Sequence, residues 1–374
     1  MSKDKKFCAE HSVHEPFTEK QANRMACPLD PKHSVDKSKL KQHLFVCNAR
    51  KPTEFPAYIK LGYNLGEPAT ESEEEFRLHD VPQSTLEPVI TLINELFDKF
   101  VAGTIETNHR NHEALAEELS NEIYGPEKRR HLQQTSSILG IMEHEGFLKP
   151  KTFFIEYGAG KAALTFWLAS AIEKLEGAKI LVVDRESHRY KKDHLVTNRD
   201  MVERIRADIS DLDLQHLESV KHCESMVGVS KHLCGGATDL ALRCMVQGNQ
   251  NGVKSTGFII CVCCHHQCTW NTFVGKDWLV QNGIDKAAFG LVIKMVSWCV
   301  CGEGQNRKKS LAEETPERKA ERKEREEIGW KCKRILDHAR ANYMNTNNYD
   351  AKMSFYADKS TTLENVCITG ALKI

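Results

Sequence analysis

The feature that most constrains the fold of this sequence is a glycine-rich turn that opens a long alternation of strands and helices. An apolar run at residues 152–158 ends in Gly158-Ala-Gly160, and a helical segment follows at residues 163–175. Further strand-like segments, with a helix around residues 237–245 between the last two, lie at residues 179–184, 204–208, 225–230 and 255–264. This alternation predicts an α/β domain with a parallel sheet covered by helices on both faces.

The end of the chain distinguishes between two common kinds of such a sheet. A helical segment at residues 328–343 is followed by strands at residues 353–357 and 364–371, which are close enough to form a hairpin. A parallel sheet that ends in an antiparallel hairpin is the Rossmann-like order of class I methyltransferases. A typical dehydrogenase domain lacks the hairpin.

Two glycines and three acids predict the ligand of the turn. Gly158 and Gly160 let the backbone approach a ligand, and the following helix N-terminus presents free N–H groups, although this pattern also fits a dinucleotide. Glu156 precedes the glycines, where a negative charge suits a sulfonium and repels a pyrophosphate. Asp184 and Asp208 end the next two strands, where carboxylates accept from ribose hydroxyls and an adenine amino group. We therefore predict that these five residues bind S-adenosylmethionine.

The first fifty residues are rich in Cys and His and have little apolar periodicity, so they need a metal as their core. Cys27, His33, His43 and Cys47 stand in the spacing Cys-x5-His-x9-His-x3-Cys. Two thiolates and two imidazoles complete the tetrahedral shell of a structural zinc ion. A helix over residues 39–47 would place His43 and Cys47 one turn apart on one face.

Composition divides the chain into three parts. Residues 1–50 form the zinc-binding module, with the finger itself at residues 27–47, and residues 51–145 form a connector followed by a helical segment. Residues 146–374 form the Rossmann-like domain. A charged stretch at residues 302–327 interrupts this domain, and its lack of apolar residues indicates an exposed helix or a disordered insertion.

Charge and cysteine content limit the partners and the compartment. The 374 residues include 52 Lys and Arg and 52 Asp and Glu, so any contact with nucleic acid must use local basic patches. The sequence shows no signal-peptide segment and no apolar run of about eighteen residues. We expect a cytoplasmic or nuclear protein without membrane contact, whose 14 cysteines stay reduced and serve metal binding, packing or catalysis.

The segment Gly-Val-Ser-Lys-His-Leu-Cys-Gly-Gly-Ala-Thr-Asp-Leu-Ala-Leu-Arg-Cys at residues 228–244 closely resembles the fourth motif of the eukaryotic tRNA acceptor-stem 2′-O-methyltransferases. The resemblance spans nearly the whole chain, with further matches at residues 7–11, 27–33, 263–270, 297–302 and 363–366. It implies an S-adenosylmethionine-dependent enzyme that methylates the ribose of nucleotide 4 in the acceptor stem of certain tRNAs.

One part of the family pattern is missing here. In that family two further cysteines precede the Phe-Cys pair that corresponds to Phe7-Cys8, and this sequence lacks them. Cys8, His11 and His14 alone are an incomplete set of zinc ligands. We therefore assign no metal ligand among them.

Lys231 and His232 are the predicted catalytic residues. Both follow a predicted strand, at the sheet edge where open α/β folds bind their ligands. A neutral Lys231 can take the proton of a ribose hydroxyl, and a charged one can stabilise the alkoxide. His232 is the alternative base.

Cys263, Cys264, His265, His266 and Cys268 invite a metal interpretation. Their spacing is cramped, because neighbouring residues of a strand point to opposite faces. Buried cysteines are also common in core strands. We therefore favour a role in packing or in shaping the substrate site.

Two other classes of function fit part of the sequence. A nicotinamide-dependent (NAD) oxidoreductase with a zinc finger would use the glycine-rich turn but has no use for Asp208. A non-catalytic RNA-binding factor would use the finger and leave the larger domain inert, which the intact set of acids and glycines argues against. A protein partner is not predictable from the sequence.

Overall fold

The computed structural model describes residues 23–31, 33–47, 49–50, 54–67, 76–220, 223–300 and 315–373. The chain divides into two compact units, Met1–Pro56 and Ala57–Ile374. Residues 57–145, which we predicted as connector and helical segment, belong to the same unit as residues 146–374. Cys8, His11 and His14 lie outside the described residues, as do residues 301–314 of the charged insertion.

The smaller unit has a short hairpin and a helix in its described part. Strand β1 (Arg24–Ala26) pairs antiparallel with β2 (Ser34–Asp36). The Asp36 carboxylate accepts a hydrogen bond from the Ser38 backbone N–H at 2.9 Å and so starts the 3-10 helix η3 (Lys37–Lys39), which α1 (Leu40–Val46) follows. The buried apolar residues among those described here are few: Cys27, Val35 and Cys47.

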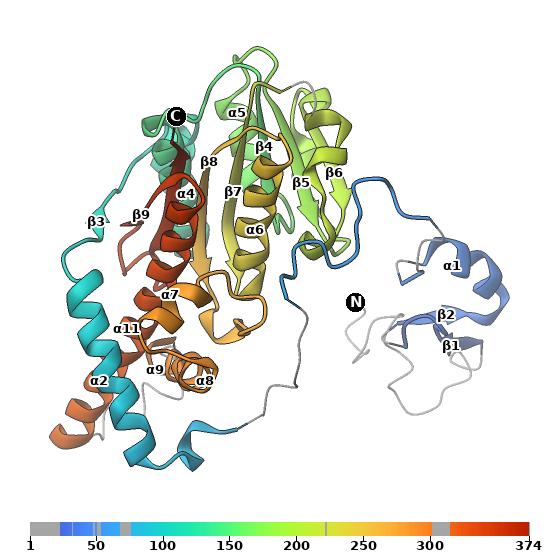
Figure 1. Ribbon diagram of the computed structural model, residues 1–374. Helices are drawn as coiled ribbons and strands as arrows, with labels where there is room; N and C mark the ends of the chain where they lie inside the picture. The colour runs from blue at the N-terminus through green and yellow to red at the C-terminus, as the bar shows by residue number, and fades with distance from the viewer. Residues whose placement is uncertain are drawn as a thin grey trace. The chain divides into compact units, whose positions relative to one another are not determined.

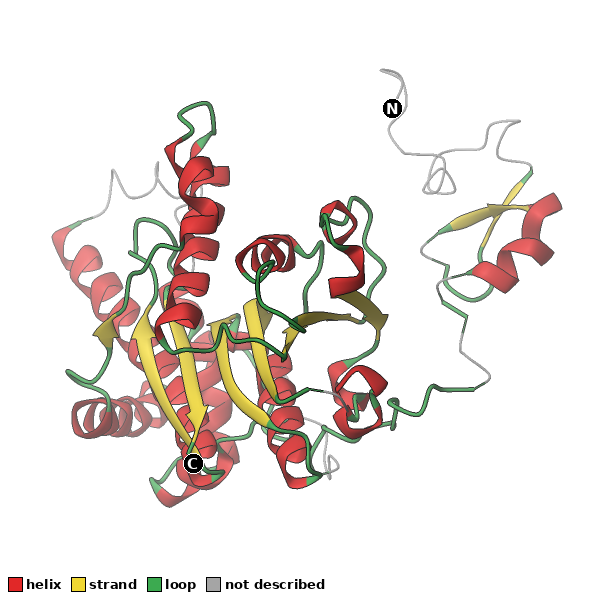
Figure 2. Ribbon diagram, turned by 90° about the horizontal axis from the view of Figure 1, so that it is seen from above, coloured by secondary structure: helices red, strands yellow, loops and turns green. Residues whose placement is uncertain are grey.

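In the described part of the larger unit, one eight-stranded sheet has the order β3-β9-β10-β8-β7-β4-β5-β6 (Figures 1 and 2). Strands β4 to β8 are parallel, and β10 is antiparallel to both β8 and β9. The predicted parallel sheet with an antiparallel C-terminal hairpin is therefore confirmed. The strands are β3 (Glu106–Thr107), β4 (Thr152–Tyr157), β5 (Lys179–Asp184), β6 (Val202–Arg206), β7 (Ser225–Cys234), β8 (Ser255–Cys263), β9 (Tyr349–Phe355) and β10 (Val366–Leu372).

Helices cover both faces of this sheet (Figures 1 and 2). One face packs on α4 and α5, and the other packs on α2, α6, α7, α8 and α11. Within the described residues of this unit the helices are α2 (Gln83–Phe100), α3 (Ala116–Ser120), α4 (Pro126–His144), α5 (Ala163–Ala171), α6 (Gly236–Gln250), α7 (Lys276–Gln281), α8 (Lys286–Met295), α9 (Ser297–Val300) and α11 (Pro316–Thr346). No helix in the described ranges is long and apolar enough to span a membrane.

The alternation of residues along β4 shows how the two cores are separated. Phe153, Ile155 and Tyr157 belong to the core on the α6 and α11 face, and Phe154 belongs to the core on the α4 and α5 face. Successive side chains of a strand point to opposite faces. Glu156 therefore lies on the α4 and α5 face, under the first turn of α5.

Three predicted boundaries differ from the structure. Strand β7 continues from the predicted end at residue 230 to Cys234, with an irregular register between Ser230 and Leu233. Strand β6 ends at Arg206, so Asp208 lies in the following loop. Helix α11 begins at Pro316, which makes residues 316–327 of the predicted insertion the start of a long helix.

A buried group of charged side chains joins α6, α11 and the 3-10 helix η11 (His265–Gln267) after β8. Arg340 Nη2 lies 2.7 Å from Asp239 Oδ2, Asp337 Oδ1 lies 2.6 Å from His265 Nε2, and Asp337 Oδ2 lies 2.9 Å from Arg334 Nη2. Burial would raise the pKa of Asp337, but His265, Arg334 and Arg340 together lower it, so the carboxylate stays ionised. Because an unpaired buried charge is costly, these three elements must pack together.

Removing Arg340 tests the importance of this group. Arg340→Met leaves the buried Asp239 carboxylate without its cation and should reduce the free energy of unfolding by about 3–5 kcal/mol. The control Lys151→Met removes an exposed ion pair with Glu224 and should cost at most about 1 kcal/mol. Urea denaturation of the full chain, followed by tryptophan fluorescence, measures both variants. Equal small losses would show that the buried pair does not hold the fold.

Candidate functional site

Cys27, His33, His43 and Cys47 converge as predicted. The two Sγ atoms are 3.7 Å apart, the two Nε2 atoms are 3.2 Å apart, and each histidine nitrogen lies 3.2 or 3.6 Å from a cysteine sulfur. A tetrahedral zinc ion, with bonds of about 2.3 Å to sulfur and about 2.0 Å to nitrogen, separates its ligand atoms by about 3.3–3.8 Å. The four side chains therefore fit a structural zinc ion, which would supply the core that this small unit otherwise lacks.

The turn between β4 and α5 has the backbone that its glycines predict. The φ angle is +63° at Gly158 and +53° at Gly160. A Cβ atom on Gly158 would lie 2.7 Å from Leu233 Cδ1, whereas a Cβ atom on Gly160 would meet no atom within 4 Å. Gly158 therefore brings the turn against β7, and Gly160 leaves the space in which a ligand can approach the backbone.

Glu156 lies beneath this turn and anchors α5. Its Oε2 accepts hydrogen bonds from the Thr165 backbone N–H, at 2.9 Å, and from the Thr165 hydroxyl. Ala162, which precedes α5, offers no side-chain cap, so Glu156 caps the helix instead. Burial raises the pKa of Glu156 to about 7, although the hydrogen bonds from Thr165 and the charges of Arg204 and Lys231 lower it.

Asp184, the last residue of β5, binds the glycine-rich turn. Its carboxylate accepts from the Gly160 N–H at 2.7 Å and from the Glu186 N–H at 2.8 Å. His188 Nε2 lies 3.2 Å from the oxygen that accepts from Glu186, whereas the oxygen that accepts from Gly160 keeps a second lone pair. With 11% of the side chain exposed, a ribose hydroxyl can donate to that second oxygen. Asp208 follows the neighbouring strand β6, where it accepts from the Ser210 N–H at 3.0 Å and is half-buried. The two acids therefore lie beyond the ends of adjacent strands.

Lys231 contacts α4 from β7. Its Nζ donates to the His131 carbonyl at 2.8 Å and to the Thr135 hydroxyl at 3.1 Å. Burial lowers the pKa of Lys231 to about 8, and the charge of Glu156 opposes this shift. The structure thus brings the predicted base close enough to the acid under the glycine-rich turn for the two charges to interact.

His232 also contacts α4, through a 3.2 Å contact between its Nε2 and Gln134 Oε1. Although His232 is exposed, partial desolvation of its ring, with the charges of Lys231 and His131, lowers the pKa of His232. Its imidazole is therefore neutral at physiological pH. Sequence reasoning missed α4 as a wall of the site, because His131, Gln134 and Thr135 form no motif and lie about a hundred residues from β7.

Two known families match parts of this sequence. The family described as Methyltransferase TRM13 matches residues 133–371, and the U11-48K-like CHHC zinc finger matches residues 24–48. The chain belongs to the TRM13 methyltransferase family. It is 32% identical to the mouse "tRNA:m(4)X modification enzyme TRM13 homolog" over 439 residues, which cover 98% of this chain and 89% of the relative. It is 29% identical to the Schizosaccharomyces pombe TRM13 enzyme over 373 residues, which cover 96% of this chain and 98% of the relative.

Membership of the TRM13 family confirms S-adenosylmethionine as the cofactor and the N-terminal module as a CHHC zinc finger. It also excludes the oxidoreductase alternative. The residue-level contacts to the cofactor stay predictions: Gly158 and Gly160 at the turn, Asp184 and Asp208 beyond the strand ends, and Glu156 beneath them. The open space over Gly160 and the second lone pair of the Asp184 oxygen beside it fit such a ligand.

This TRM13-family chain has a second group of cysteines, whose members differ from those of the cluster at residues 263–268 considered in the sequence. Cys234, Cys263 and Cys264 place their Sγ atoms within 4.8 Å of one another. Cys234 was missing from the predicted group, although the strand register sets it directly beside Cys263. The sequence alone did not show which residues of β7 and β8 lie side by side.

His265 and Cys268 belong to a different environment. His265 pairs with Asp337, and Cys268 Sγ lies 3.0 Å from Arg340 Nη2, so both are part of the buried charged group. His266 is exposed and lies close enough to Cys234 for its charge to lower the pKa of that thiol. The predicted cluster is therefore split between a structural network and a separate thiol group.

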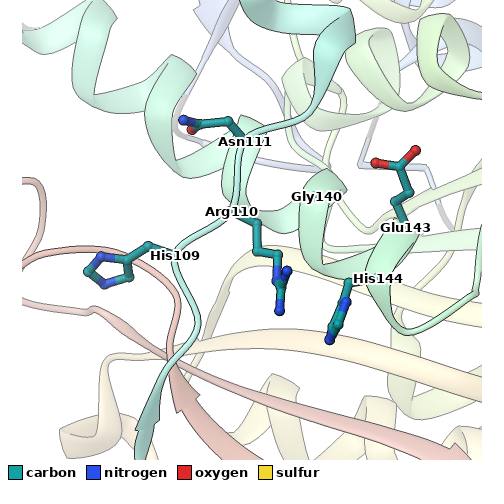
Figure 3. Close-up of a pocket in the computed structure, with 6 residues that line it drawn as sticks. All are labelled: His109, Arg110, Asn111, Gly140, Glu143 and His144. Atoms are coloured by element: carbon teal, nitrogen blue, oxygen red, sulfur yellow. The ribbon is translucent and has the colours of Figure 1, made fainter.

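A cavity of about 490 Å³ lies at the other end of α4 (Figure 3). Its lining comes from the loop at residues 109–111 and from Gly140, Glu143 and His144 of α4. Lys231 contacts the first half of α4, at His131 and Thr135. None of the predicted cofactor or catalytic residues lines this cavity, so it is separate from the site described above.

The assignment of Asp184 predicts a specific loss of cofactor affinity. Asp184→Ala removes the charged acceptor from the turn and should weaken binding by about 1.5–3 kcal/mol, on the order of tenfold to a hundredfold. Titration calorimetry with S-adenosylhomocysteine measures the change. The control Glu173→Ala removes an exposed acid beyond the end of α5 and should bind normally. Equal affinity in wild type and Asp184→Ala would refute the assignment.

Proposed function

We propose that this protein transfers a methyl group from S-adenosylmethionine to the ribose 2′-oxygen of nucleotide 4 in the acceptor stem of certain tRNAs. The names of the mouse and fission-yeast relatives support tRNA as the substrate class. The resemblance of residues 228–244 to the acceptor-stem 2′-O-methyltransferases supports the ribose of nucleotide 4. The proposed chemistry rests above all on Lys231, a half-buried amine with a pKa of about 8 next to the cofactor turn.

The cofactor supplies a methyl group that its positively charged sulfur already activates. The remaining tasks of the protein are to orient the hydroxyl, to exclude water and to remove a proton. A hydroxyl is a poor nucleophile at neutral pH, so a base near it accelerates the reaction. The burial that lowers the pKa of Lys231 makes its neutral form available for this role.

The contacts of Lys231 orient its lone pair. A neutral amine has two N–H groups and one lone pair, and two acceptors, the His131 carbonyl and the Thr135 hydroxyl, receive the two N–H groups. The Thr135 hydroxyl donates in turn to the His131 carbonyl at 2.9 Å, which fixes its own orientation. The lone pair is then left to accept the ribose proton. Thr135 is thus a positioning residue for Lys231.

The position of the label tests the reaction itself. We expect full-length protein to transfer a labelled methyl group from S-adenosylmethionine to an unmodified tRNA transcript. Nuclease and alkaline digestion should release the label as one 2′-O-methylated nucleotide, from position 4. Label on a base or at another nucleotide would refute the proposed specificity. Binding of cofactor and tRNA without any transfer would favour the non-catalytic RNA-binding factor.

The two candidate bases predict different pH profiles. With Lys231 as base, the single-turnover rate should rise with pH up to about pH 8 and then level off. With His232 as base, its lowered pKa would give a rate that is already constant above neutral pH. We expect the first profile, measured by methyl transfer at saturating cofactor and tRNA.

Substitutions separate these two roles further. Lys231→Met should slow transfer by about 10²–10⁴-fold and remove the rise with pH. His232→Ala should keep the rise, and the control Lys174→Met, at an exposed lysine, should keep both rate and profile. A profile that persists in Lys231→Met would exclude Lys231 as the base.

A further inference from the structure

Three thiols meet at the sheet edge that also carries Lys231. Cys234 ends β7, Cys263 ends β8, and Cys264 follows directly. Cys234 and Cys263 are register partners, and their Sγ atoms are 3.6 Å apart. Neither the TRM13 family match nor the proposed methyl transfer gives these thiols a role.

The separation of the sulfur atoms fits a shared metal ion. Two thiolates bound to one tetrahedral zinc ion, at about 2.3 Å each, lie about 3.8 Å apart. The two cysteines of the CHHC finger, which is a zinc site, stand 3.7 Å apart in the same structure. Among the described residues these two groups alone bring three or more metal-binding side chains this close together.

The backbone of Cys264 explains how two adjacent cysteines reach one point. Alternation along a strand would send them to opposite faces, which is why the sequence argued against a metal. The strand ends at Cys263, however, and Cys264 has a φ angle of +50°, in the left-handed region. This conformation costs a non-glycine residue about 1 kcal/mol or more, and it turns the second thiol back toward the first.

Simple packing of apolar thiols does not account for the arrangement. Cys263 is buried, but Cys234 is exposed and Cys264 is only half-buried, so the group as a whole does not fill a core. A packing role also needs no left-handed residue. Both observations are expected if the thiols are held around an ion near the protein surface.

We propose that Cys234, Cys263 and Cys264 bind a second zinc ion, through three thiolates. A tetrahedral ion then keeps one position for a water molecule or another oxygen donor, and the exposure of Cys234 leaves that position accessible to solvent. The ion joins the ends of β7 and β8 and so fixes the strand that carries Lys231. It is independent of the finger, whose ligands belong to the other unit.

Zinc content of full-length variants tests the proposal. Cys27→Ser disables the finger and should leave about one zinc ion per chain, measured by mass spectrometry of the metal. Adding Cys234→Ser should remove that ion. The control pair Cys27→Ser and Cys223→Ser changes a half-buried cysteine outside the group and should retain it. Circular dichroism and cofactor binding verify that each variant is folded.

The spectrum of bound cobalt gives a second measurement that needs no substitution in the thiol group. Cobalt bound to Cys27→Ser should show tetrahedral absorption with charge-transfer intensity from three thiolates. Two results would overturn the proposal. One is a Cys27→Ser chain that carries no metal and reacts as free thiols or as a disulfide between Cys234 and Cys263. The other is a zinc ion that persists after Cys234→Ser.

Discussion

The arrangement of the site depends on the pairing of Arg340 with two buried carboxylates. Arg340, Asp239 and Asp337 are all completely buried, so the chain cannot leave any of them without its partner. Arg340 also donates to the Gly235 carbonyl, at 3.3 Å, and to Cys268 Sγ. One side chain of α11 therefore fixes the loop after β7 and the turn after β8 together. Those two segments adjoin Lys231 and the three-thiol group, so a structural network on one face of the sheet determines the geometry of its functional edge.

Local patterns of sequence predicted the sheet because they depend on neighbouring residues only. The apolar strands β4, β5 and β8, the glycine-rich turn and the hairpin of β9 and β10 all have short-range signals. Arg340 has no short-range signal, because the local sequence does not distinguish a buried arginine in a helix from an exposed one. That partner, Asp239, is 101 residues away. For the charged stretch before residue 328, an exposed helix was one of the two expectations, and residues 316–327 are helical; only their continuity with α11 had no signal.

The strand ends that carry the candidate site were predictable, and its surroundings were less so. Glu156, Asp184 and Lys231 were proposed as site residues because open α/β sheets bind ligands at their strand ends, and these roles stay predictions. The end of β7 was placed too early, because a lysine and a histidine interrupt its apolar run and the strand nevertheless continues to Cys234. The contacts of Lys231 with α4, and the convergence of Cys264 with Cys234, depend on tertiary packing and on one left-handed residue. Neither has a periodic signal.

Glu156 and Lys231 show how burial alone can shift the pKa values of an acid and a base toward neutrality. Burial disfavours the charged form of each group, so it raises the pKa of Glu156 to about 7 and lowers that of Lys231 to about 8. Their mutual attraction opposes both shifts and keeps the two values close to neutrality. A cationic ligand over the glycine-rich turn would favour ionised Glu156 and disfavour charged Lys231. The direct repulsion favours neutral Lys231, whereas the ionised Glu156 favours its charged form. The two effects of a cationic ligand on Lys231 therefore oppose each other, and the lysine can keep a pKa close to neutrality in the complex.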